Sequence, residues 1–423
     1  MADKVRSSWN AAAEEYASIG VDAEEAVRRL AEIPLSVHCW QGDDVGGFET
    51  PDSVLGGGGI AVTGNHPGKA ANADELRSDL DKVYSMIGGS HRLNLHAIYG
   101  EFGGRKTGRD EIGAEHFAGW MQWSDEKGIP LDFNGTFFSH PMAESGFTLS
   151  SKDPGIRSFW VEHAKRVREI AAGFGRAQGS PSIVNVWIPD GHKDIPADRL
   201  GYRRLLCDSL DRIFEDEIPD TLVKDAVETK LFGIGSEAFV VGSHEFYMGY
   251  AQSRGKMPCL DLGHFHPTEL IADKISSTLL FNKEILLHVS RPMRWDSDHV
   301  VVLNDEIRML TEEIVRSGRI GDIHIGLDFF DGTLNRIGAW TTGARAAQKG
   351  LLLALLQPAE KLRELEAGGD YYGRLALLER LKSMPSGAVW DYFCAIAGVP
   401  LEADIYDEVS AYGRKILSER GRR

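Results

Sequence analysis

The chain has 423 residues, of which 42% are hydrophobic and 26% charged, as in a globular protein that buries a large core. Its formal net charge of −16 argues against a nucleic-acid partner, because phosphate binding needs a cluster of cationic side chains. No run approaches the roughly 20 apolar residues that a membrane helix needs, so we expect no membrane association either. A small neutral substrate is compatible with these properties.

The N-terminal segment, residues 1–30, has a helical pattern with scattered charges and lacks the apolar core of a signal peptide. We therefore expect a cytoplasmic protein. The four cysteines are far apart and form no Cys-x-x-Cys pair: Cys39, Cys207, Cys259 and Cys394. This spacing suggests neither a disulfide framework nor a thiolate zinc site, and it predicts reduced, mostly buried thiols.

Short runs with strand character alternate with amphipathic segments along residues 1–356, which is the pattern of βα units around a parallel sheet. The predicted strands are residues 36–40, 92–99, 130–134, 182–189, 225–232, 258–263, 285–290 and 323–329. The predicted helices between them are residues 72–87, 110–127, 154–176, 199–217, 267–281, 304–317 and 344–356. Eight such strands predict an α/β fold, the closed (β/α)8 TIM barrel.

Glycine-rich phosphate-binding motifs are missing from this segment. No Gly-x-Gly-x-x-Gly follows the first predicted strand, so a doubly wound sheet with a dinucleotide lacks its marker. The four consecutive glycines at 56–59 follow no strand directly and precede no Gly-Lys-Ser/Thr. We interpret them as a flexible loop near the barrel mouth.

Residues 357–423 change to polar helical patterns, at 359–367, 371–383 and 403–419, with no predicted strand. We predict a C-terminal helical extension outside the barrel. It either packs on its own subunit or embraces a neighbour in an oligomer, and the sequence favours neither arrangement.

Acidic and imidazole side chains accumulate at the C-terminal ends of four consecutive predicted strands, where TIM barrels build their active sites. Glu228 and Lys230 alternate with Val227 and Thr229 in the fifth strand and therefore share one face. The next three strands and their loops add Asp261, His264, His288, Asp296, Asp298 and Asp328. These residues predict one converging polar site.

So many carboxylates in one barrel mouth would repel one another, since unit charges about 4 Å apart cost on the order of 4 kcal/mol at an effective dielectric of about 20. Bound cations remove that cost. Donor sets rich in oxygen with some imidazole suit Mn²⁺, Co²⁺ or Mg²⁺, with Zn²⁺ as a further choice, and the donors outnumber the needs of one ion. We therefore predict two divalent metals per subunit, with Mn²⁺ preferred. His266, His299 and His324 are expected to orient ligands or to serve the structure.

Aromatic and hydrogen-bonding side chains near the strand ends are candidates for substrate contacts. Trp187 at the end of the fourth strand and Phe330 after the eighth could form walls against a carbon skeleton. His96 lies in the second predicted strand and is either a substrate contact or a satisfied core histidine. Lys230 could stabilise charge on a substrate oxygen or pair with a ligand carboxylate.

Seven segments carry a resemblance to the L-rhamnose isomerase family: residues 38–44, 93–99, 187–191, 225–235, 259–269, 288–301 and 324–331. The resemblance runs from the N-terminal helix to the C-terminal tail, and its motifs are long and rigidly spaced. It implies a (β/α)8 barrel of the xylose-isomerase-like type, a homotetramer and two divalent cations. The implied activity is the reversible conversion of L-rhamnose to L-rhamnulose in rhamnose catabolism.

Site residues follow from the resemblance by matching motif. It implies a structural metal held by Glu228, Asp261, His288 and Asp328, and a catalytic metal held by His264, Asp296 and Asp298. Water and sugar oxygens would complete the coordination of the catalytic metal. His244 stands where the family pattern has Asn; it is outside the ligand set, so it affects only the role of its own loop.

Moving a carbonyl from C1 to C2 transfers a hydrogen between the carbons and a proton between the oxygens. Every well-placed Asp and Glu is better used as a metal ligand, so no free carboxylate base remains, and this favours a 1,2-hydride shift over an enediol. Metal chelation would polarise the carbonyl, and a metal-bound water would carry the oxygen proton.

Metal and fold do not select the sugar, so the alternative is a related metal-dependent aldose isomerase or a ketose 3-epimerase acting on another sugar. A metal-dependent nuclease on a similar barrel is disfavoured by the net charge of −16. A non-catalytic sugar-binding protein would have lost ligands, whereas the full set is present here.

Overall fold

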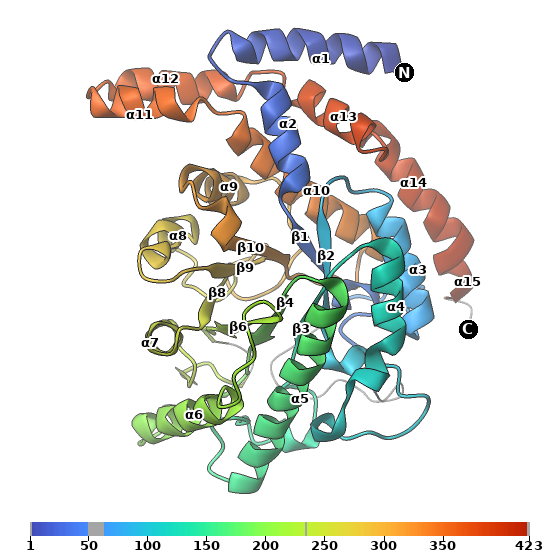
Figure 1. Cartoon of the computed structure of the whole chain (residues 1–423), viewed down its shortest axis with the longest axis vertical. Helices are drawn as coiled ribbons and strands as arrows, with labels where there is room; N and C mark the ends of the chain where they lie inside the picture. The colour runs from blue at the N-terminus through green and yellow to red at the C-terminus, as the bar shows by residue number, and fades with distance from the viewer. Residues whose placement is uncertain (1, 50–62, 233–234, 421–423) are drawn as a thin grey trace.

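The computed structural model describes residues 2–49, 63–232 and 235–420, and its centre is a barrel of eight parallel strands (Figure 1). The strands close in the order β1-β10-β9-β8-β6-β4-β3-β2. They are β1 (Leu35–His38), β2 (His91–His96), β3 (Leu131–Asn134), β4 (Ser182–Val186), β6 (Val223–Glu228), β8 (Met257–Asp261), β9 (Ile285–Val289) and β10 (Ile323–Leu327). Each overlaps one predicted strand, so the predicted (β/α)8 barrel is confirmed.

Helices follow the strands and cover the outside of the barrel. They are α3 (Ala73–Tyr84), α4 (Ala118–Lys127), α5 (Pro154–Gln178), α6 (Arg199–Ile213), α7 (His244–Arg254), α8 (Ala272–Leu279), α9 (Asp305–Arg316) and α10 (Arg336–Leu355). Polar side chains cap their first turns: Asn72 accepts from the Glu75 amide and Asn304 from the Ile307 amide. Gly179, in the left-handed region, ends the long helix α5.

Three regions before residue 356 differ from the prediction. Helix α7 was not predicted, because its aromatic residues and Gly249 make a weak helical pattern. The predicted helix over 110–127 becomes two 3-10 turns followed by α4, with Gly113 at the break. A small antiparallel sheet of β5 (Gly191–His192) and β7 (Phe239–Val240) joins two loops at the barrel mouth, a pairing too short to be read from sequence.

The strands bury apolar side chains against the surrounding helices and direct polar ones into the barrel. Val37, Leu95 and Phe133 are fully buried in the main hydrophobic core. The residues next to them in the strands have the opposite orientation, since strand side chains alternate. Polar side chains such as His96 and Asn134 therefore face the barrel interior, which also holds a small apolar cluster of Ile183, Ala226, Met257, Cys259 and Leu286.

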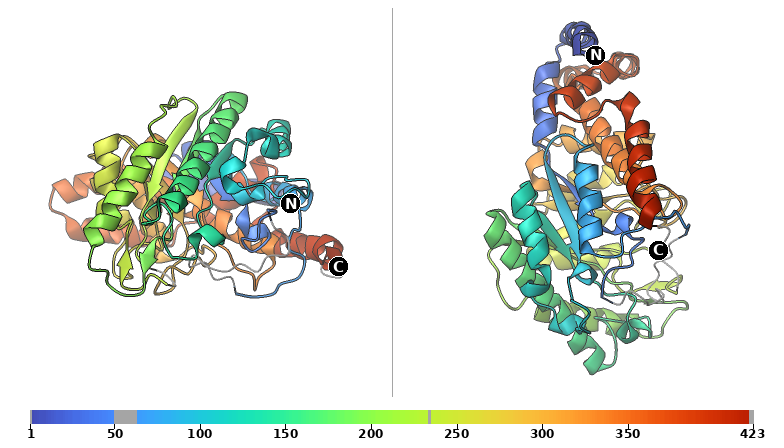
Figure 2. Two further views of the ribbon diagram at one scale, coloured as in Figure 1. Left: turned by 90° about the horizontal axis from the view of Figure 1, so that it is seen from below. Right: turned by 90° about the vertical axis from the view of Figure 1, so that its right-hand side faces the viewer.

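The two ends of the chain form helices outside the barrel; most of them lie at one end of the molecule, and the last ones run down its side (Figure 1). They are α1 (Ala2–Ala17), α2 (Ala23–Glu32), α11 (Ala359–Ala367), α12 (Tyr371–Leu381), α13 (Ser386–Ile396), α14 (Ile405–Tyr412) and α15 (Ser418–Arg420). Figure 2 shows α1 and α5 at opposite ends of the long axis. In the part of the tail that the structure describes, no strand follows residue 356, as predicted, although α13 was missed because it is mostly apolar and has no clear polar face.

Specific contacts fasten the tail to its own chain. Trp9 of α1 stacks on Tyr392 of α13 with ring centroids 4.0 Å apart. Arg420 pairs with the buried Asp79 of α3 at 2.6 Å. The tail from α13 onward thus packs on its own subunit; contact with a neighbour, and the division of the chain at residue 357, stay predictions.

Two further predictions concern the glycines at 56–59 and the membrane. The glycines at 56–59, interpreted as a loop near the barrel mouth, lie outside the described residues. Among the helices that are described, none combines the length and the apolar composition needed to cross a membrane.

Candidate active site

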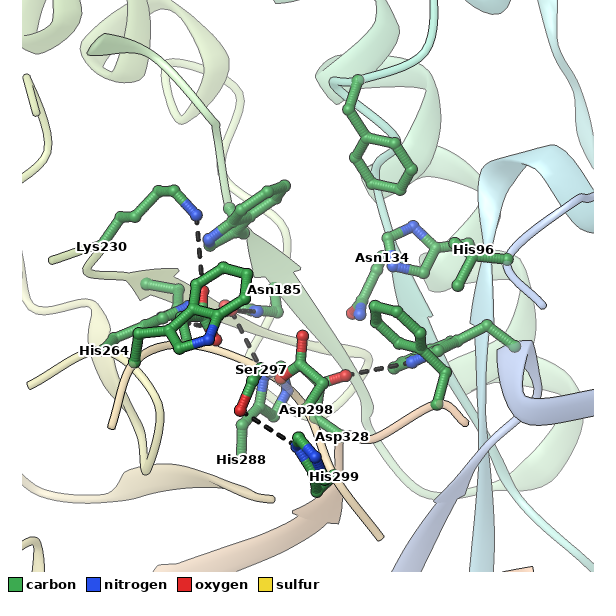
Figure 3. A pocket seen from close by; sticks show the side chains of 18 of the residues that line it. His96, Asn134, Asn185, Lys230, His264, His288, Ser297, Asp298, His299 and Asp328 are labelled. Atoms are coloured by element: carbon green, nitrogen blue, oxygen red, sulfur yellow. Dashed lines mark hydrogen bonds and ion pairs between the residues drawn. The ribbon is translucent and has the colours of Figure 1, made fainter. Parts of the chain in front are cut away.

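A cavity of about 210 Å³ opens at the C-terminal ends of the barrel strands (Figure 3). Its polar lining comes from nearly every strand: His96, Asn134, Asn185, Glu228, Lys230, His264, His288, Asp296, Ser297, Asp298, His299 and Asp328. Its apolar lining includes Trp40, Phe138, Trp187, Trp295 and Phe330. All predicted site residues line this cavity except Asp261, which is buried and pairs in register with His288.

A first cluster of donors consists of Glu228, Asp261, His288 and Asp328, whose ligand atoms lie within 4.8 Å of one another. Strand register brings them together, since Asp261 pairs with His288 and Gly326 also pairs with His288. The Nδ1 atom of His288 is 3.2 Å from Asp328 Oδ2, 3.3 Å from Glu228 Oε2 and 3.8 Å from Asp261 Oδ2. Three carboxylates thus converge on one imidazole.

A second cluster consists of Asp261, His264 and Asp296. His264 Nε2 lies 3.0 Å from Asp296 Oδ2, and its Nδ1 lies 3.2 Å from Glu228 Oε1. Asp261 belongs to both clusters, so the two groups are adjacent. Lys230 also lines the cavity, and its Nζ is 3.5 Å from Asp296 Oδ2.

Asp298 lies in the cavity beside these clusters but in neither of them. Its backbone has φ = 42°, a left-handed conformation that is uncommon for a residue with a side chain. The amide of Phe330 donates to the Asp298 carbonyl at 3.0 Å and helps to hold that conformation. Burial, followed by the charges of Asp296, Asp328 and Asp261, raises the pKa of Asp298 well above its ordinary value.

The crowding of charged groups shifts the pKa values of the acids in the two clusters. Burial raises the pKa of Asp261 to about 8, and neighbouring Glu228, Asp328 and Asp296 push it in the same direction. Burial would also raise the pKa of Glu228, but the imidazoles of His288 and His264 lower it below its usual range. One carboxylate therefore tends to hold a proton while another relies on imidazolium neighbours.

These donors fit divalent cations. Several buried polar atoms in the clusters have no hydrogen-bond partner: Asp261 Oδ2, His264 Nδ1, both ring nitrogens of His288, and Asp296 Oδ1. Buried polar atoms are normally satisfied, so their convergence calls for a missing partner. Four carboxylates and two imidazoles suit Mn²⁺, Mg²⁺, Co²⁺ or Zn²⁺.

Aromatic rings shape the walls of the cavity. Trp187 stacks over His264 with centroids 6.4 Å apart, and Lys230 Nζ lies 4.7 Å from the centre of the Trp187 ring. Phe138 meets Trp187 edge to face at 5.8 Å. Phe330 lines the same space. Apolar walls beside a polar floor are suited to a ligand with a carbon skeleton and several hydroxyl groups.

Two orienting residues were missed by the sequence reasoning. Asn185 donates a hydrogen bond from its amide nitrogen to Glu228 Oε2. Trp40 donates from Nε1 to Asp328 Oδ1 at 3.0 Å. Asn185 lies in β4, two residues before Trp187, which follows the strand, so the alternation that placed Trp187 in the mouth could have placed Asn185 there too.

Of the four remaining predicted histidines, two line the cavity and two do not. His96 and His299 line the cavity, where His96 Nδ1 is 3.1 Å from the Thr136 hydroxyl and His299 Nδ1 is 3.0 Å from the Ser297 hydroxyl. His324 lies at the start of β10 and pairs with Glu284 at 2.6 Å, away from the cavity. His266 contacts Thr268 and has no place in the lining.

A family model and curated relatives match nearly the whole chain. A family model described as L-rhamnose isomerase (RhaA) matches residues 3–420. An L-rhamnose isomerase from Rhodopirellula baltica is 55% identical over 419 residues, which cover 99% of this chain and 98% of the relative. One from Escherichia coli is 52% identical over 421 residues, covering 100% of both chains. A solved D-allulose 3-epimerase from Methylomonas sp. aligns with a TM-score of 0.47 at 10% identity, covering 75% of this chain and 96% of that one.

Proposed function

The chain belongs to the L-rhamnose isomerase family, and from that premise we propose that it interconverts L-rhamnose and L-rhamnulose by a 1,2-hydride shift at two divalent cations. The observation that carries the metal part of this proposal is the convergence of four carboxylates and two imidazoles at the end of the barrel. Among the described residues that line the cavity, Lys230 is the one lysine or arginine, and its ion pair is with Asp296.

Glu228, Asp261, His288 and Asp328 would hold one cation, and His264, Asp296 and Asp298 the other, with Asp261 within reach of the second. Mn²⁺ is our first choice, with Co²⁺, Mg²⁺ and Zn²⁺ as alternatives. When bound, such cations polarise a sugar carbonyl and acidify coordinated water. Trp40 and Asn185 would orient the carboxylates of Asp328 and Glu228.

The other lining residues would bind and orient the sugar. Trp187, Phe138 and Phe330 would cover its carbon skeleton and exclude water from the migrating hydrogen. Burial lowers the pKa of His96 to about 3, so its neutral ring can exchange hydrogen bonds with a hydroxyl without adding charge. Lys230 would place its ammonium beside a substrate oxygen that gains negative charge.

The hydride route is supported by the roles of the acidic residues. Among the described residues that line the cavity, the acids are Glu228, Asp296, Asp298 and Asp328, and all four belong to the proposed ligand sets. None is left to remove a proton from C2 and exchange it with water. The hydrogen would therefore pass directly between C2 and C1 of a sugar held in one orientation.

Turnover of L-rhamnose carrying tritium at C2 tests this mechanism. We expect most of the tritium to appear at C1 of the L-rhamnulose formed, after metal is removed and Mn²⁺ restored. Extensive release of tritium to water would overturn the hydride route and indicate an enediol with a true base. L-Mannose, D-allose and D-xylose, assayed beside L-rhamnose, would reveal another preferred sugar.

We also propose a cytoplasmic homotetramer. The four cysteines are free, which suits a reducing compartment. Large apolar side chains on α12 are exposed, including Tyr371 at 63% and Tyr372 at 79%, and such side chains are commonly covered in oligomers. Light scattering coupled to size-exclusion chromatography measures the mass; a monomer at working concentration would contradict the tetramer.

A further inference from the structure

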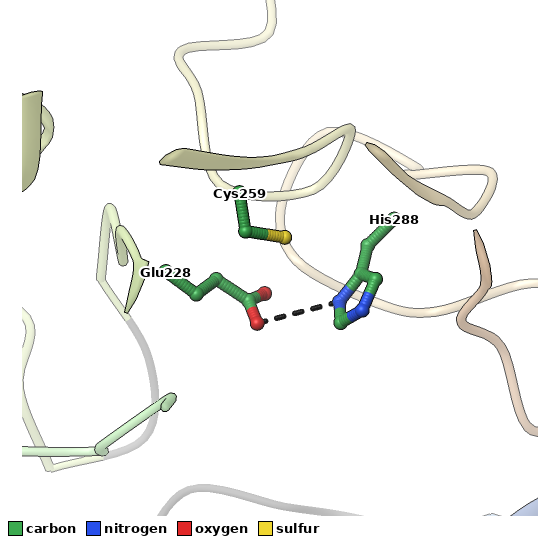
Figure 4. A group of neighbouring side chains, drawn as sticks. All are labelled: Glu228, Cys259 and His288. Atoms are coloured by element: carbon green, nitrogen blue, oxygen red, sulfur yellow. Dashed lines mark ion pairs between the residues drawn. The ribbon is translucent and has the colours of Figure 1, made fainter. Parts of the chain in front are cut away.

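Cys259 lies directly against the first cluster. Its sulfur is within 4.8 Å of ligand atoms of Glu228 and His288, and all three residues are buried. Strand register explains this placement: Cys259 is opposite Glu228 in the β6–β8 pair and two residues before Asp261, so both face the barrel interior. Figure 4 shows the sulfur pointing toward the space between Glu228 and His288.

His288 has donor capacity that protein contacts do not use. It is 1% exposed, and neither ring nitrogen has a hydrogen-bond partner, although Nδ1 lies 3.2 Å from Asp328 Oδ2 and 3.3 Å from Glu228 Oε2. Within the described ranges, Cys39, Cys207 and Cys394 belong to no comparable group of donors. The interpretation of the cysteines as reduced, mostly buried thiols is therefore incomplete for Cys259.

We propose that Cys259, Glu228 and His288 form an alternative, sulfur-containing site for a thiophilic divalent metal such as Cd²⁺. The inference rests on the proposed function, because it concerns a cation site of the first cluster. A hard ion prefers the carboxylates of Asp261 and Asp328, whereas a soft ion prefers a thiolate. Since both sets use Glu228 and His288, one ion excludes the other.

Binding of the soft ion is a ligation with a simple balance. The Cys259 S–H bond breaks, a sulfur–metal bond forms, and the thiol proton is released to the buffer; no atom changes its oxidation state. An ion bound to Cys259 would lie deeper in the barrel than an ion bound to Asp261 and Asp328, because Cys259 precedes Asp261 by two residues in β8. Mn²⁺ and Cd²⁺ should therefore compete for this protein.

The test uses the full-length protein stripped of metal and titrated with Cd²⁺. We expect an ultraviolet sulfur-to-cadmium charge-transfer band in the wild type and in the Cys207→Ser control, and no band in Cys259→Ser. Cd²⁺ affinity should fall by more than about tenfold in Cys259→Ser, while Mn²⁺ affinity changes by less than about threefold. Cys207 is the appropriate control because it is the cysteine that is only half-buried and could bind Cd²⁺ adventitiously.

Cadmium NMR or X-ray absorption of the wild type makes the same test without any variant, so it does not depend on the folding of Cys259→Ser. Bound Cd²⁺ with only oxygen and nitrogen neighbours, or a band that persists in Cys259→Ser, would overturn this inference alone. Failure to bind either Mn²⁺ or Cd²⁺ would overturn the proposed cation sites as well.

Discussion

Asp296 and Asp298 stand two residues apart in the loop after β9 but have different surroundings. Asp296 contacts His264 at 3.0 Å and Lys230 at 3.5 Å. Asp298 lies beside Asp296 and Asp328, with its backbone held in the left-handed region. Strain of this kind persists where the surrounding structure imposes it, often at functional sites.

We expect Asp296→Asn and Asp298→Asn each to reduce turnover of L-rhamnose by at least about a hundredfold, because each removes a negatively charged ligand of the proposed catalytic metal. Circular dichroism should remain that of the wild type, since the barrel core is untouched. Asp273→Asn, on the surface of α8, is the matched control. Undiminished activity in either variant would show that this metal is bound elsewhere.

Asp43, in the loop after β1, is a buried acid with a pH-dependent effect on stability. It is 2% exposed and accepts hydrogen bonds from the Tyr99 hydroxyl and the Gly47 amide, both at 2.6 Å. Burial raises its pKa from 3.8 to about 7 despite those bonds. Between these values the folded protein keeps a proton that the unfolded chain releases.

The stability that Asp43 contributes is therefore present at low pH and is lost as pH rises through about 7. Relative to Asp43→Asn, the free energy of unfolding of the wild type should fall by on the order of 1 kcal/mol per pH unit between about pH 4 and pH 7. Urea titrations of both proteins across this range measure the difference. A constant difference would mean that Asp43 stays ionised in the fold.

At the scale of elements, one carboxylate joins the loop before α5 to the end of β4. Asp190 accepts hydrogen bonds from the amides of Thr148 and Ser150 at 2.8 and 2.9 Å and from both hydroxyls. Its own carbonyl accepts from the Val241 amide at 3.0 Å, beside the small β5–β7 sheet. This network supports the loop that follows Trp187.

Asp190→Ala should lower the free energy of unfolding by about 3 kcal/mol, because four buried donors lose their acceptor. Asp190→Asn, which keeps one oxygen, should cost less. The exposed Asp220→Ala provides the control. Chemical denaturation measures all three; equal stability of Asp190→Ala and Asp220→Ala would show that water replaces the carboxylate.

At the scale of the whole molecule, bound cations should stabilise the barrel. The clusters join β6, β8, β9 and the segment after β10, so ions held there link about half of the barrel's circumference. Ligands that bind only the folded state stabilise it by mass action, by about 4 kcal/mol at a free concentration a thousandfold above Kd.

Chelation should therefore lower the Tm by several degrees, and added Mn²⁺ should restore it, as followed by scanning calorimetry. Secondary structure at room temperature should persist, because the apolar shell between strands and helices does not involve the metal ligands. A Tm that changes with neither chelator nor Mn²⁺ would contradict cation binding at the clusters.

The pattern of residues within single segments was enough to predict most strands of this protein and several residues of its site. Eight strands were recognisable because each is a short run with strand character between helical segments. Glu228, Asp261, His288 and Asp328 were recognisable because strand alternation places them in the barrel mouth. The failures were local too: α7 and α13 lack the polar and apolar faces that mark an amphipathic helix.

Only the tertiary structure decided which groups meet. Register between neighbouring strands gives Asp261 a place in both clusters, brings Cys259 beside Glu228, and lets Asn185 hold the same carboxylate. The loop backbone sets Asp298 apart from Asp296. These relations depend on how distant strands are packed and staggered around a closed barrel, and no periodicity within a single segment encodes that stagger.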